Sequence, residues 1–333
     1  HDCSNDPFPF HEHLLCIKYP ALIYLTPLYP LHAGFSSRAG ARDLKHPPDG
    51  PIFTPMQESD YRPLIELAIA EDLGSDGDVT SQAVVPEGER TAVLWSKDQG
   101  VLAGEQVFAA VFHRIDPAVG VTFLQHDGAR LAKGDRVAEV SGRALSLLSG
   151  ERIALNFICH LSGIASEARA LSDLAASSGR AAILDTRKTL PGWRALAKYA
   201  ARIGGARNHR IGLYDMVLVK DNHVDAAGSV SEAVARVRAR WGTRFTVEVE
   251  ARTLAEVRAA VEAGADIVML DNMDLPLMRE AVTLVGGRAK VEASGTMTRE
   301  RIPGVSATGV DFISVGGLTH SVKAFDFSLK IGR

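Results

Sequence analysis

The chain has 333 residues, of which 23% are charged, and its formal net charge at neutral pH is −3. A sequence pI near 6.4 argues against a nucleic-acid scaffold, which usually carries a broadly basic face, so any cationic site must be local. At roughly 150 residues per domain, this length predicts about two domains.

The three cysteines, Cys3, Cys16 and Cys159, form no CxxC pair and have no spacing typical of a zinc site or a disulfide framework. Proteins that depend on disulfides belong to oxidising compartments. We therefore expect a reducing, cytoplasmic environment for this chain.

Residues 1–55 differ from the rest, because their apolar stretch is broken by prolines, histidines and a lysine. The stretch is too interrupted to span a membrane, and it lacks the basic start and the cleavage site of a signal peptide. The first methionine is Met56. We expect residues 1–55 to be a disordered extension and the natural protein to start at Met56.

The next segment predicts a small α/β unit. Apolar residues recur at helical spacing in "YRPLIELAIAEDL", and Asp78 follows as a candidate helix cap. Residues 91–143 contain short β-rich runs separated by turn residues, which is typical of an antiparallel sheet. Residues 146–178 continue as one long helical pattern.

After residue 180, strand-length apolar runs alternate with helical segments. The six runs are "AAILDTRKT", "DMVLVKDNH", "RFTVEVEA", "ADIVMLDN", "AKVEASG" and "VDFISVGG". This alternation predicts parallel strands joined by helical crossovers. Most of the runs end in polar residues or glycine, and the carboxyl ends of barrel strands form an active-site face, so we expect a complete or partial (β/α) barrel.

The first two strand ends carry a group of cations. Arg187 and Lys188 end the first run, and Lys220 ends the second, with His209 and Arg210 between them. Arginine suits bidentate binding of carboxylate or phosphate, so the group indicates a small polyanionic ligand. The alternative for each residue is a solvated loop charge. That alternative weakens for the whole set, because neighbouring cations repel one another.

The next two strand ends carry carboxylates, Glu248 and Glu250 and then Asp271, which Asn272 follows. Carboxylates that face phosphate suit a Mg²⁺ ion. Of Glu248 and Glu250 we expect only one to point inward, because side chains alternate along a strand. The alternative is that these carboxylates only pair with the arginines.

The last two strand ends are rich in small residues. Ser294 and Gly295 follow the fifth run, and Gly316 and Gly317 follow the sixth. Barrels often bind phosphate with the loops after their last two strands, where backbone N–H groups approach the anion. Glycine that merely allows a tight turn is the competing explanation. Gly204-Gly205 also has a simple structural explanation, because two glycines at this point can end the helix "RALAKYAARI".

These motifs together resemble one family. "EDLGSDGDVTS", "ERIALNFICHLSGIAS", "DTRKTLPGWRALAKYAARIGGARNHRIGLYD", "VKDNHV", "VEVEA", "MLDNM", "VEASG" and "SVGGLTHS" are similar, in order, to the quinolinate phosphoribosyltransferases. The resemblance covers about residues 60–331. Two departures are Thr296, where the family usually has glycine, and Gly317, where alanine is common, and both concern the geometry of the phosphate loops.

The resemblance implies an incomplete (β/α) barrel with an N-terminal α/β sandwich domain. The N-terminal domain would span residues 56–165, with segment 318–333 packing back on it, and the barrel would span residues 166–317. The family's quinolinate site would include Arg152, Arg187, His209, Arg210 and Lys220. Lys188 and Lys220 would face pyrophosphate, Glu250 and Asp271 would bind Mg²⁺ and the ribose hydroxyls, and Ser294, Gly295, Gly316 and Gly317 would hold the 5′-phosphate.

The implied reaction transfers phosphoribosyl from phosphoribosyl pyrophosphate to quinolinate and decarboxylates it, which gives nicotinate mononucleotide. The resemblance also implies a homodimer in which Arg152 reaches the partner's site, and neither nucleic acid nor membrane as a partner. Two alternatives stay open. One is a related phosphoribosyltransferase that acts on another pyridine acid or azole, and the other is a non-catalytic phosphate-metabolite binding barrel.

Overall fold

The computed structural model describes residues 56–332, which belong to a single compact unit. The predicted extension, residues 1–55, lies outside the described residues, and the start of the natural protein at Met56 stays a prediction. Among the residues described, no helix is both long enough and apolar enough to cross a membrane.

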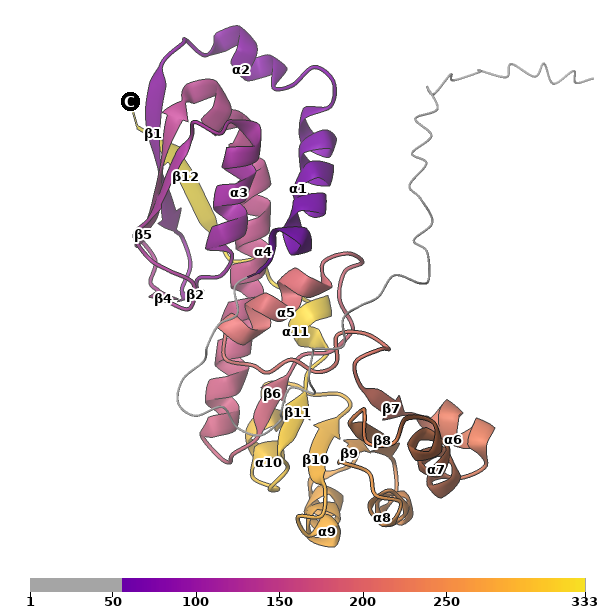
Figure 1. The fold of residues 1–333 in the computed structure, drawn as a ribbon. Coiled ribbons are helices and arrows are strands. Elements are labelled where there is room, and N and C mark those ends of the chain that lie inside the picture. Colours follow the sequence, from indigo (N-terminus) through magenta and orange to yellow (C-terminus); the bar gives the residue numbers. More distant parts are fainter. Residues whose placement is uncertain (1–55, 333) are drawn as a thin grey trace, which may run out of the picture. The chain divides into compact units, whose positions relative to one another are not determined.

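The N-terminal part is an antiparallel sheet covered by helices. Its strands lie in the order β12-β1-β5-β3, and the short pair β2-β4 lies apart from them. The strands are β1 (Glu89–Ser96), β2 (Gly100–Val101), β3 (Gly120–Phe123), β4 (Arg130–Leu131), β5 (Arg136–Arg143) and β12 (Phe327–Ile331). The helices are α1 (Glu58–Leu73), α2 (Val79–Val84) and α3 (Glu105–Ile115). Figure 1 shows α3 beside the sheet and α1 farther out. The predicted cap is present, because the Asp78 side chain accepts a hydrogen bond from Ser81 N–H.

The C-terminal strand completes this sheet. β12 pairs antiparallel with β1, with Ala92 opposite Ile331 and Ser96 opposite Phe327. The chain therefore leaves the N-terminal sheet, builds a second sheet and returns to add an edge strand. That return ties the two parts of the molecule together through backbone hydrogen bonds.

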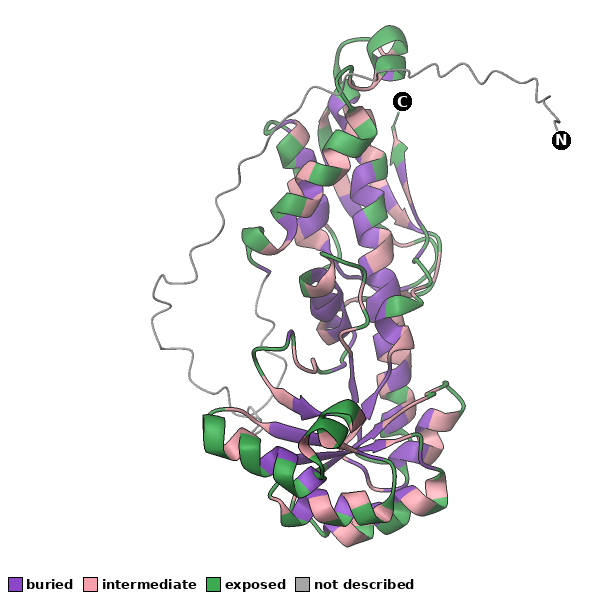
Figure 2. Ribbon diagram, turned by 90° about the vertical axis from the view of Figure 1, so that its right-hand side faces the viewer, coloured by how far each residue is buried: buried purple, intermediate pink, exposed green. Residues whose placement is uncertain are grey.

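Helix α4 (Ala144–Ala176) connects the two sheets and lies within two residues of the range that its periodicity predicts. Its 33 residues give a length of about 50 Å. Figures 1 and 2 show it running from the antiparallel sheet to the parallel one, with buried residues along its length. Ser162 and Ser166 on this helix accept hydrogen bonds from the backbone N–H groups of Ala103 and Val101.

The second sheet has six parallel strands in the order β6-β11-β10-β9-β8-β7. They are β6 (Ala182–Leu184), β7 (Val217–Val219), β8 (Val247–Ala251), β9 (Ile267–Asp271), β10 (Lys290–Ser294) and β11 (Phe312–Ser314). The connecting helices are α5 (Arg194–Ile203), α6 (Asp221–Ala227), α7 (Val230–Trp241), α8 (Leu254–Glu262), α9 (Leu275–Val285), α10 (Arg301–Ser306) and α11 (Gly317–His320).

The edge strands β6 and β7 do not pair with each other in the part of the chain that is described. On its edge away from β11, β6 forms a single parallel bridge within the described residues, between Leu184 and Arg207. The prediction of an incomplete barrel with an N-terminal α/β domain is confirmed.

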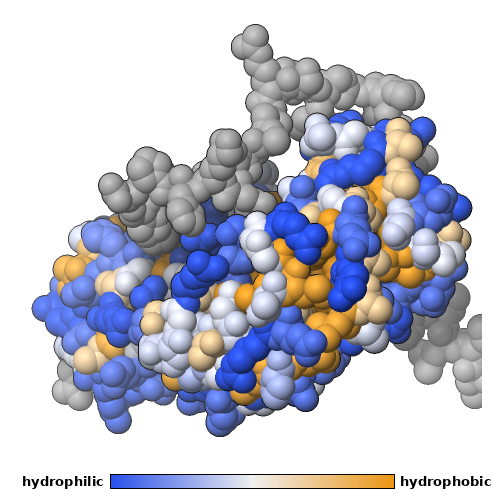
Figure 3. Space-filling model, turned by 90° about the horizontal axis from the view of Figure 1, so that it is seen from below, coloured by the Kyte–Doolittle hydropathy of each residue, from blue (hydrophilic) through white to orange (hydrophobic). Residues whose placement is uncertain are grey.

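Seen from below, the surface is largely hydrophilic, with hydrophobic residues gathered in limited patches (Figure 3).

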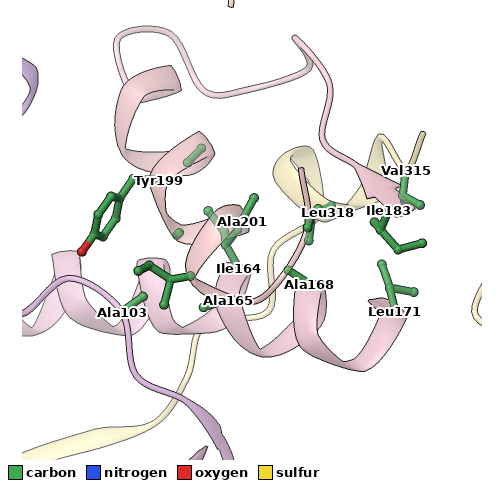
Figure 4. Close-up of a cluster of buried hydrophobic side chains, with 14 of the residues drawn as sticks. Ala103, Ile164, Ala165, Ala168, Leu171, Ile183, Tyr199, Ala201, Val315 and Leu318 are labelled. Carbon is green, nitrogen blue, oxygen red and sulfur yellow. The ribbon is translucent and has the colours of Figure 1, made fainter. Parts of the chain in front are cut away.

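A small-residue core joins α4 to the barrel. Ala165 and Ala168 of α4, both fully buried, lie in the same cluster as Ile183 of β6 and Ala201 of α5 (Figure 4). Helix α5 ends at Gly204, as predicted, and Gly205 follows with a φ of 97°. This positive φ favours glycine at position 205, and a Cβ at Gly204 would lie 2.2 Å from the Ala165 carbonyl oxygen, so position 204 requires glycine for space.

Two buried glutamates lie inside the parallel sheet. Glu248 of β8 and Glu292 of β10 are both 0% exposed, and each lies near the His209 Nε2 atom, at 2.9 and 3.6 Å. Ser314 donates a hydrogen bond of 2.6 Å to Glu292. Burial raises the pKa of Glu248 to about 7, and burial together with the Glu248 charge raises the pKa of Glu292 well above its ordinary value.

The raised pKa of Glu292 predicts a pH-dependent stability. Above pH 4.5 the unfolded chain releases this proton while the folded chain retains it, so stability is lost as pH rises, by up to about 1.4 kcal/mol per pH unit. Gln imitates the protonated acid. We expect Glu292→Gln to fold and to show a shallower decline of unfolding free energy between pH 5 and pH 8, measured by urea denaturation.

The exposed Glu262→Gln variant is the control and should follow the wild-type curve. Parallel curves for wild type and Glu292→Gln would show that Glu292 does not retain its proton in the folded state.

Candidate active site

A cavity of about 460 Å³ opens at the carboxyl ends of the parallel strands. Ten of the twelve predicted site residues line it: Arg187, Lys188, His209, Arg210, Lys220, Glu250, Asp271, Ser294, Gly295 and Gly316. They come from six strand ends and from the segment before β7. A parallel sheet explains the gathering, because its strands all end at the same edge.

Strand alternation decides which side chains face this cavity. Met269 and Asp271 of β9 line it together, as do Leu218 and Lys220 at the end of β7. Parallel register places Asp271 beside Ser294 on β10. Residues two apart on a strand share a face, so β9 and β7 each contribute an apolar wall residue and a polar residue at the rim.

The expectation that only one of Glu248 and Glu250 points inward is wrong. Glu250 lines the cavity, while Glu248 lies buried beneath it against His209. Because they are two residues apart, both point to the same side of β8. They differ in depth along the strand, and only Glu250 reaches the open cavity.

Within the described part of the chain, the arginines on the cationic side of the cavity lack direct ion-pair partners. Among residues 56–332, Arg187, Lys188 and Arg210 form no ion pair, and the Arg187 Nε atom is buried without a hydrogen-bond partner. Burial lowers the pKa of Arg210, and the Arg187 charge lowers it further. A buried donor left unpaired is costly, so this arrangement favours a bound anion.

A buried ion pair holds the segment that carries two of these groups. Lys198 of α5 and Asp185 after β6 pair with each other, and both are nearly inaccessible. Lys198 also donates to the His209 carbonyl at 3.0 Å, and Asp185 accepts from His209 N–H at 2.9 Å. Burial raises the pKa of Asp185 and lowers that of Lys198, while their mutual attraction opposes both shifts. The backbone of residues 209–210 is therefore attached to the first strand end.

The His209 ring is fixed within the protein. Its Nδ1 accepts a 2.7 Å hydrogen bond from Arg210 N–H, so Nε2 carries the proton and donates to Glu248 at 2.9 Å. Burial lowers the pKa of His209, which favours the neutral ring. Both ring nitrogens thus have partners inside the protein, and the ring forms part of the cavity wall.

The acidic side combines two carboxylates with one lysine. Glu250 and Asp271 line the cavity, and Lys220 Nζ lies 3.9 Å from Glu250 Oε2. Burial raises the pKa of Glu250, Lys220 opposes this rise, and the Asp271 charge adds to it. Two oxygen donors that repel each other across a solvent-accessible cavity suit Mg²⁺, which takes one or two carboxylates together with waters and phosphate.

A second group of metal-ligand types lies beneath the cavity. Ligand atoms of His209, Glu248 and Glu292 all lie within 4.8 Å of one another. In this buried group, however, the hydrogen bond from His209 to Glu248 already joins two of the three atoms. Glu250 and Asp271 are therefore the better candidates for a metal that contacts substrate.

The loops after β10 and β11 bring backbone close to the cavity. Gly295 has a φ of 120°, and a Cβ there would lie 2.3 Å from Asn272 Oδ1. Gly316 lies against the Lys188 side chain, and a Cβ at Gly316 would be 3.1 Å from Lys188 Cδ. Thr319 donates a 2.7 Å hydrogen bond to the Lys188 carbonyl and so holds the first strand end against the last.

Two predicted residues lie outside this cavity. Gly317 borders a neighbouring groove of about 690 Å³ that runs along α4. Arg152 is exposed on α4 and borders none of the cavities described for residues 56–332.

Some lining residues were not among the predicted site residues. They are Thr186, Leu218, Met269, Asn272, Thr296 and Ser314. Thr186 directly precedes Arg187, and Ser314 is the last residue of β11. Their positions at strand ends could therefore have indicated that they line the cavity. Glu292, buried below, offered a further signal, because a carboxylate between the apolar residues Val291 and Ala293 of a strand is unusual.

Comparisons with known proteins agree with this geometry. Residues 78–162 and 164–330 match the N-terminal and C-terminal domains of "Quinolinate phosphoribosyl transferase". The chain is 42% identical over 304 residues to the chloroplastic nicotinate-nucleotide pyrophosphorylase [carboxylating] of Arabidopsis thaliana, covering 86% of this chain and 85% of that protein. It is 41% identical to a probable nicotinate-nucleotide pyrophosphorylase [carboxylating] of Bacillus subtilis, covering 83% and 95%.

Among solved structures, NadC from Streptococcus pyogenes superposes with a TM-score of 0.81 at 41% identity, covering 84% of this chain and 99% of that one. The same fold, the matched domains and the sequence identity confirm the resemblance that the motifs indicate. This chain therefore belongs to the quinolinate phosphoribosyltransferase family.

Proposed function

We propose that this chain transfers the phosphoribosyl group of phosphoribosyl pyrophosphate to quinolinate and releases one carboxyl group as CO₂, forming nicotinate mononucleotide and pyrophosphate. Relatives from Nicotiana tabacum carry the name quinolinate phosphoribosyltransferase [decarboxylating]. The observation that carries the proposal is the pair Arg187 and Arg210, which are partly buried at the cavity and form no ion pair within residues 56–332.

Quinolinate matches the cationic side because its ring bears two adjacent carboxylates. The guanidinium of Arg187 has a free buried Nε–H, and Arg210 lies close enough for the charge of Arg187 to lower its pKa. Planar guanidinium groups bind carboxylates in a bidentate manner. The His209 ring supplies a neutral wall against the pyridine ring, because both of its nitrogens already have partners.

Phosphoribosyl pyrophosphate matches the rest of the cavity. Lys188 and Lys220 would face its pyrophosphate, Glu250 and Asp271 its ribose hydroxyls and metal ion, and the loops at Ser294, Gly295, Gly316 and Gly317 its 5′-phosphate. When bound, Mg²⁺ would neutralise charge on the departing pyrophosphate. Lys188 and Lys220 would add positive charge at the same place, where charge develops in the transition state.

The chain's own residues need only orient and stabilise the reactants. As the bond between the anomeric carbon and pyrophosphate breaks, Glu250 and Asp271 would offset the positive charge that develops on the ribose. The pyridine nitrogen then forms a bond to that carbon and becomes cationic. When the neighbouring carboxylate departs as CO₂, the electron pair stays on the ring carbon, where the adjacent cationic nitrogen stabilises it, and a proton from water then takes the place of the carboxylate. Fixed placement of both substrates and preorganised charge are the contributions that such catalysis requires from the protein.

A direct assay tests the proposal. Purified protein with Mg²⁺, phosphoribosyl pyrophosphate and quinolinate should release CO₂ and pyrophosphate in equal amounts. Nicotinate, which lacks the second carboxylate, should be a poor substrate. Pyrophosphate release with nicotinate as fast as with quinolinate would indicate a related transferase, and binding without any release would indicate a binding protein.

We also propose that the working unit is a two-fold symmetric homodimer in which Arg152 reaches the partner's cavity. Within residues 56–332, Arg152 forms no ion pair, and Glu167, one candidate local partner, pairs with Arg299 instead. Large apolar side chains are exposed on loops beside the cavity and on the N-terminal helices: Leu190, Ile211, Leu213 and Tyr214, and Leu67, Val79 and Val84. A symmetric interface that joins these two sets would bury both twice.

Arg187→Ala should damage use of quinolinate. Loss of one partner of a buried charge pair costs about 2–5 kcal/mol, so kcat/KM for quinolinate should fall roughly 30- to several-thousand-fold. Arg180→Ala, at the amino end of β6, is the matched control and should leave the rate unchanged, because Arg180 only approaches Asp311, at 3.8 Å. A folded Arg187→Ala protein with wild-type kcat/KM would refute the role of Arg187.

Asp271→Asn should lower activity and raise the Mg²⁺ concentration that gives half-maximal rate, because the amide retains the shape but not the charge. Asp266→Asn, at the other end of β9, is the control. A titration of initial rate against Mg²⁺ decides the matter, and an unchanged midpoint in Asp271→Asn would place the metal ion elsewhere.

Subunit mixing tests the position of Arg152. Arg152→Ala and Lys220→Ala should each be inactive alone. In a mixed dimer, one of the two sites would combine an intact Arg152 with an intact Lys220. If half of the dimers are mixed, about a quarter of wild-type activity should return. If Arg152 acts within its own chain, mixing would restore nothing.

A further inference from the structure

Asn272 is the only residue other than glycine with a positive φ, 54°, among residues 56–332. It directly follows Asp271 at the end of β9, and its side chain is exposed toward the cavity that it lines. A left-handed conformation is uncommon outside glycine, although asparagine tolerates it better than most residues. Such conformations persist where the surrounding structure imposes them, and they gather at functional sites.

The Asn272 side chain joins two parts of the cavity. Its Nδ2 donates a 3.0 Å hydrogen bond to Asp271 Oδ1, and its Oδ1 accepts a 3.3 Å hydrogen bond from Thr296 N–H. Its backbone N–H donates to the Ser294 carbonyl at 3.1 Å. One residue thus contacts the carboxylate at the end of β9 and the loop that follows β10.

The loop after β10 packs tightly against Asn272. A Cβ at Gly295 would lie 2.3 Å from Asn272 Oδ1 and 3.1 Å from Asn272 Cα, so the loop can pass Asn272 only as glycine. On the other side, Arg301 donates to the carbonyls of Thr296 and Met273, at 2.7 and 3.4 Å. The turn after β9 and the loop after β10 are therefore joined twice, and only the Asn272 link faces the cavity.

We propose that Asn272 is a positioning residue that holds the Asp271 carboxylate and the Ser294–Thr296 loop in one fixed arrangement. This inference rests on the proposed function, in which these two parts bind the metal-ion end and the 5′-phosphate end of phosphoribosyl pyrophosphate. Asn272 acts through its neighbours, so its loss should weaken binding of phosphoribosyl pyrophosphate and leave quinolinate binding intact.

Three substitutions separate the contributions. Asn272→Gly accepts the positive φ but removes both side-chain hydrogen bonds. Asn272→Ala removes the bonds and adds backbone strain, so it should melt at a lower temperature than Asn272→Gly. Asn272→Asp retains an acceptor for Thr296 N–H but places a carboxylate against Asp271 in place of the donor.

The test measures two affinities and one backbone property in the purified protein. Calorimetry gives the Kd of phosphoribosyl pyrophosphate with Mg²⁺ and the Kd of quinolinate alone. Loss of a group that orients a metal ligand typically costs about 10- to 100-fold in affinity. We expect that loss for phosphoribosyl pyrophosphate in all three variants, with quinolinate affinity within about twofold of wild type.

Hydrogen exchange of a peptide containing residues 294–298, measured without ligands, supplies a readout that needs no activity. Exchange should quicken in Asn272→Gly and Asn272→Ala and stay near wild type in Asn272→Asp, which keeps the acceptor for Thr296. Asp311→Ala is the matched control, because Asp311 accepts a 2.9 Å hydrogen bond from Val291 N–H at the opposite end of β10. It should lower the melting temperature without changing either affinity.

Wild-type affinity and exchange in Asn272→Gly would overturn the inference, and so would an equal loss of affinity for both ligands. If the wild-type protein bound phosphoribosyl pyrophosphate but formed no product, the proposed function would fail. The exchange data would still decide whether Asn272 holds the loop.

Discussion

The structure depends on holding positive charges close together at one edge of a sheet. Arg187 and Arg210 face the same cavity, and the charge of one lowers the pKa of the other. The repulsion between like charges costs free energy, and other interactions in the fold must offset this cost. These interactions lie beside the cavity. Lys198 and Asp185 form hydrogen bonds with the backbone of His209. Arg194 donates hydrogen bonds to the carbonyls of Arg187 and Ile211.

The chemical character of the cavity changes along the strand order. The β6 end supplies arginine and lysine, β11 and β10 supply small residues with accessible backbone, β9 and β8 supply carboxylates, and the β7 end supplies Lys220. Beneath them, His209, Glu248 and Glu292 form a buried layer that is joined by hydrogen bonds and by proximity. Raised pKa values in that layer limit the negative charge placed under the cations, which leaves the cavity able to attract anions.

The two parts of the molecule are connected by more than one element. Helix α4 passes from one to the other, and β12 returns to pair with β1. Asp127, which accepts hydrogen bonds at the start of α3, also accepts one of 2.6 Å from Tyr199 on α5. These contacts set the N-terminal sheet in a defined position relative to the barrel of the same chain, which is a requirement for any arrangement in which that sheet serves a second chain.

Much of this protein could be read from the sequence. Apolar periodicity located α4 within two residues, and six alternating runs predicted the parallel strands and the edge at which their polar ends meet. Those features depend on local spacing, which a sequence contains directly. Most of the cations, the carboxylates and the small-residue loops could be assigned to the cavity for the same reason, because they directly follow a predicted strand, whereas His209 and Arg210 lie in the connection between two strands.

Other features arise only from tertiary structure. That Glu248 and Glu250 share a face is a matter of strand geometry, but that one is fully buried against His209 and the other reaches the cavity depends on how deep each lies in the barrel. Two hydrogen bonds, from Ser314 to Glu292 and from Thr296 N–H to Asn272, join residues at neighbouring strands that are more than twenty positions apart in the chain. The ring state of His209 and the unpaired Nε of Arg187 likewise follow from three-dimensional neighbours. Hydrogen-bond partners and burial are properties of packed elements, and local sequence spacing does not contain them.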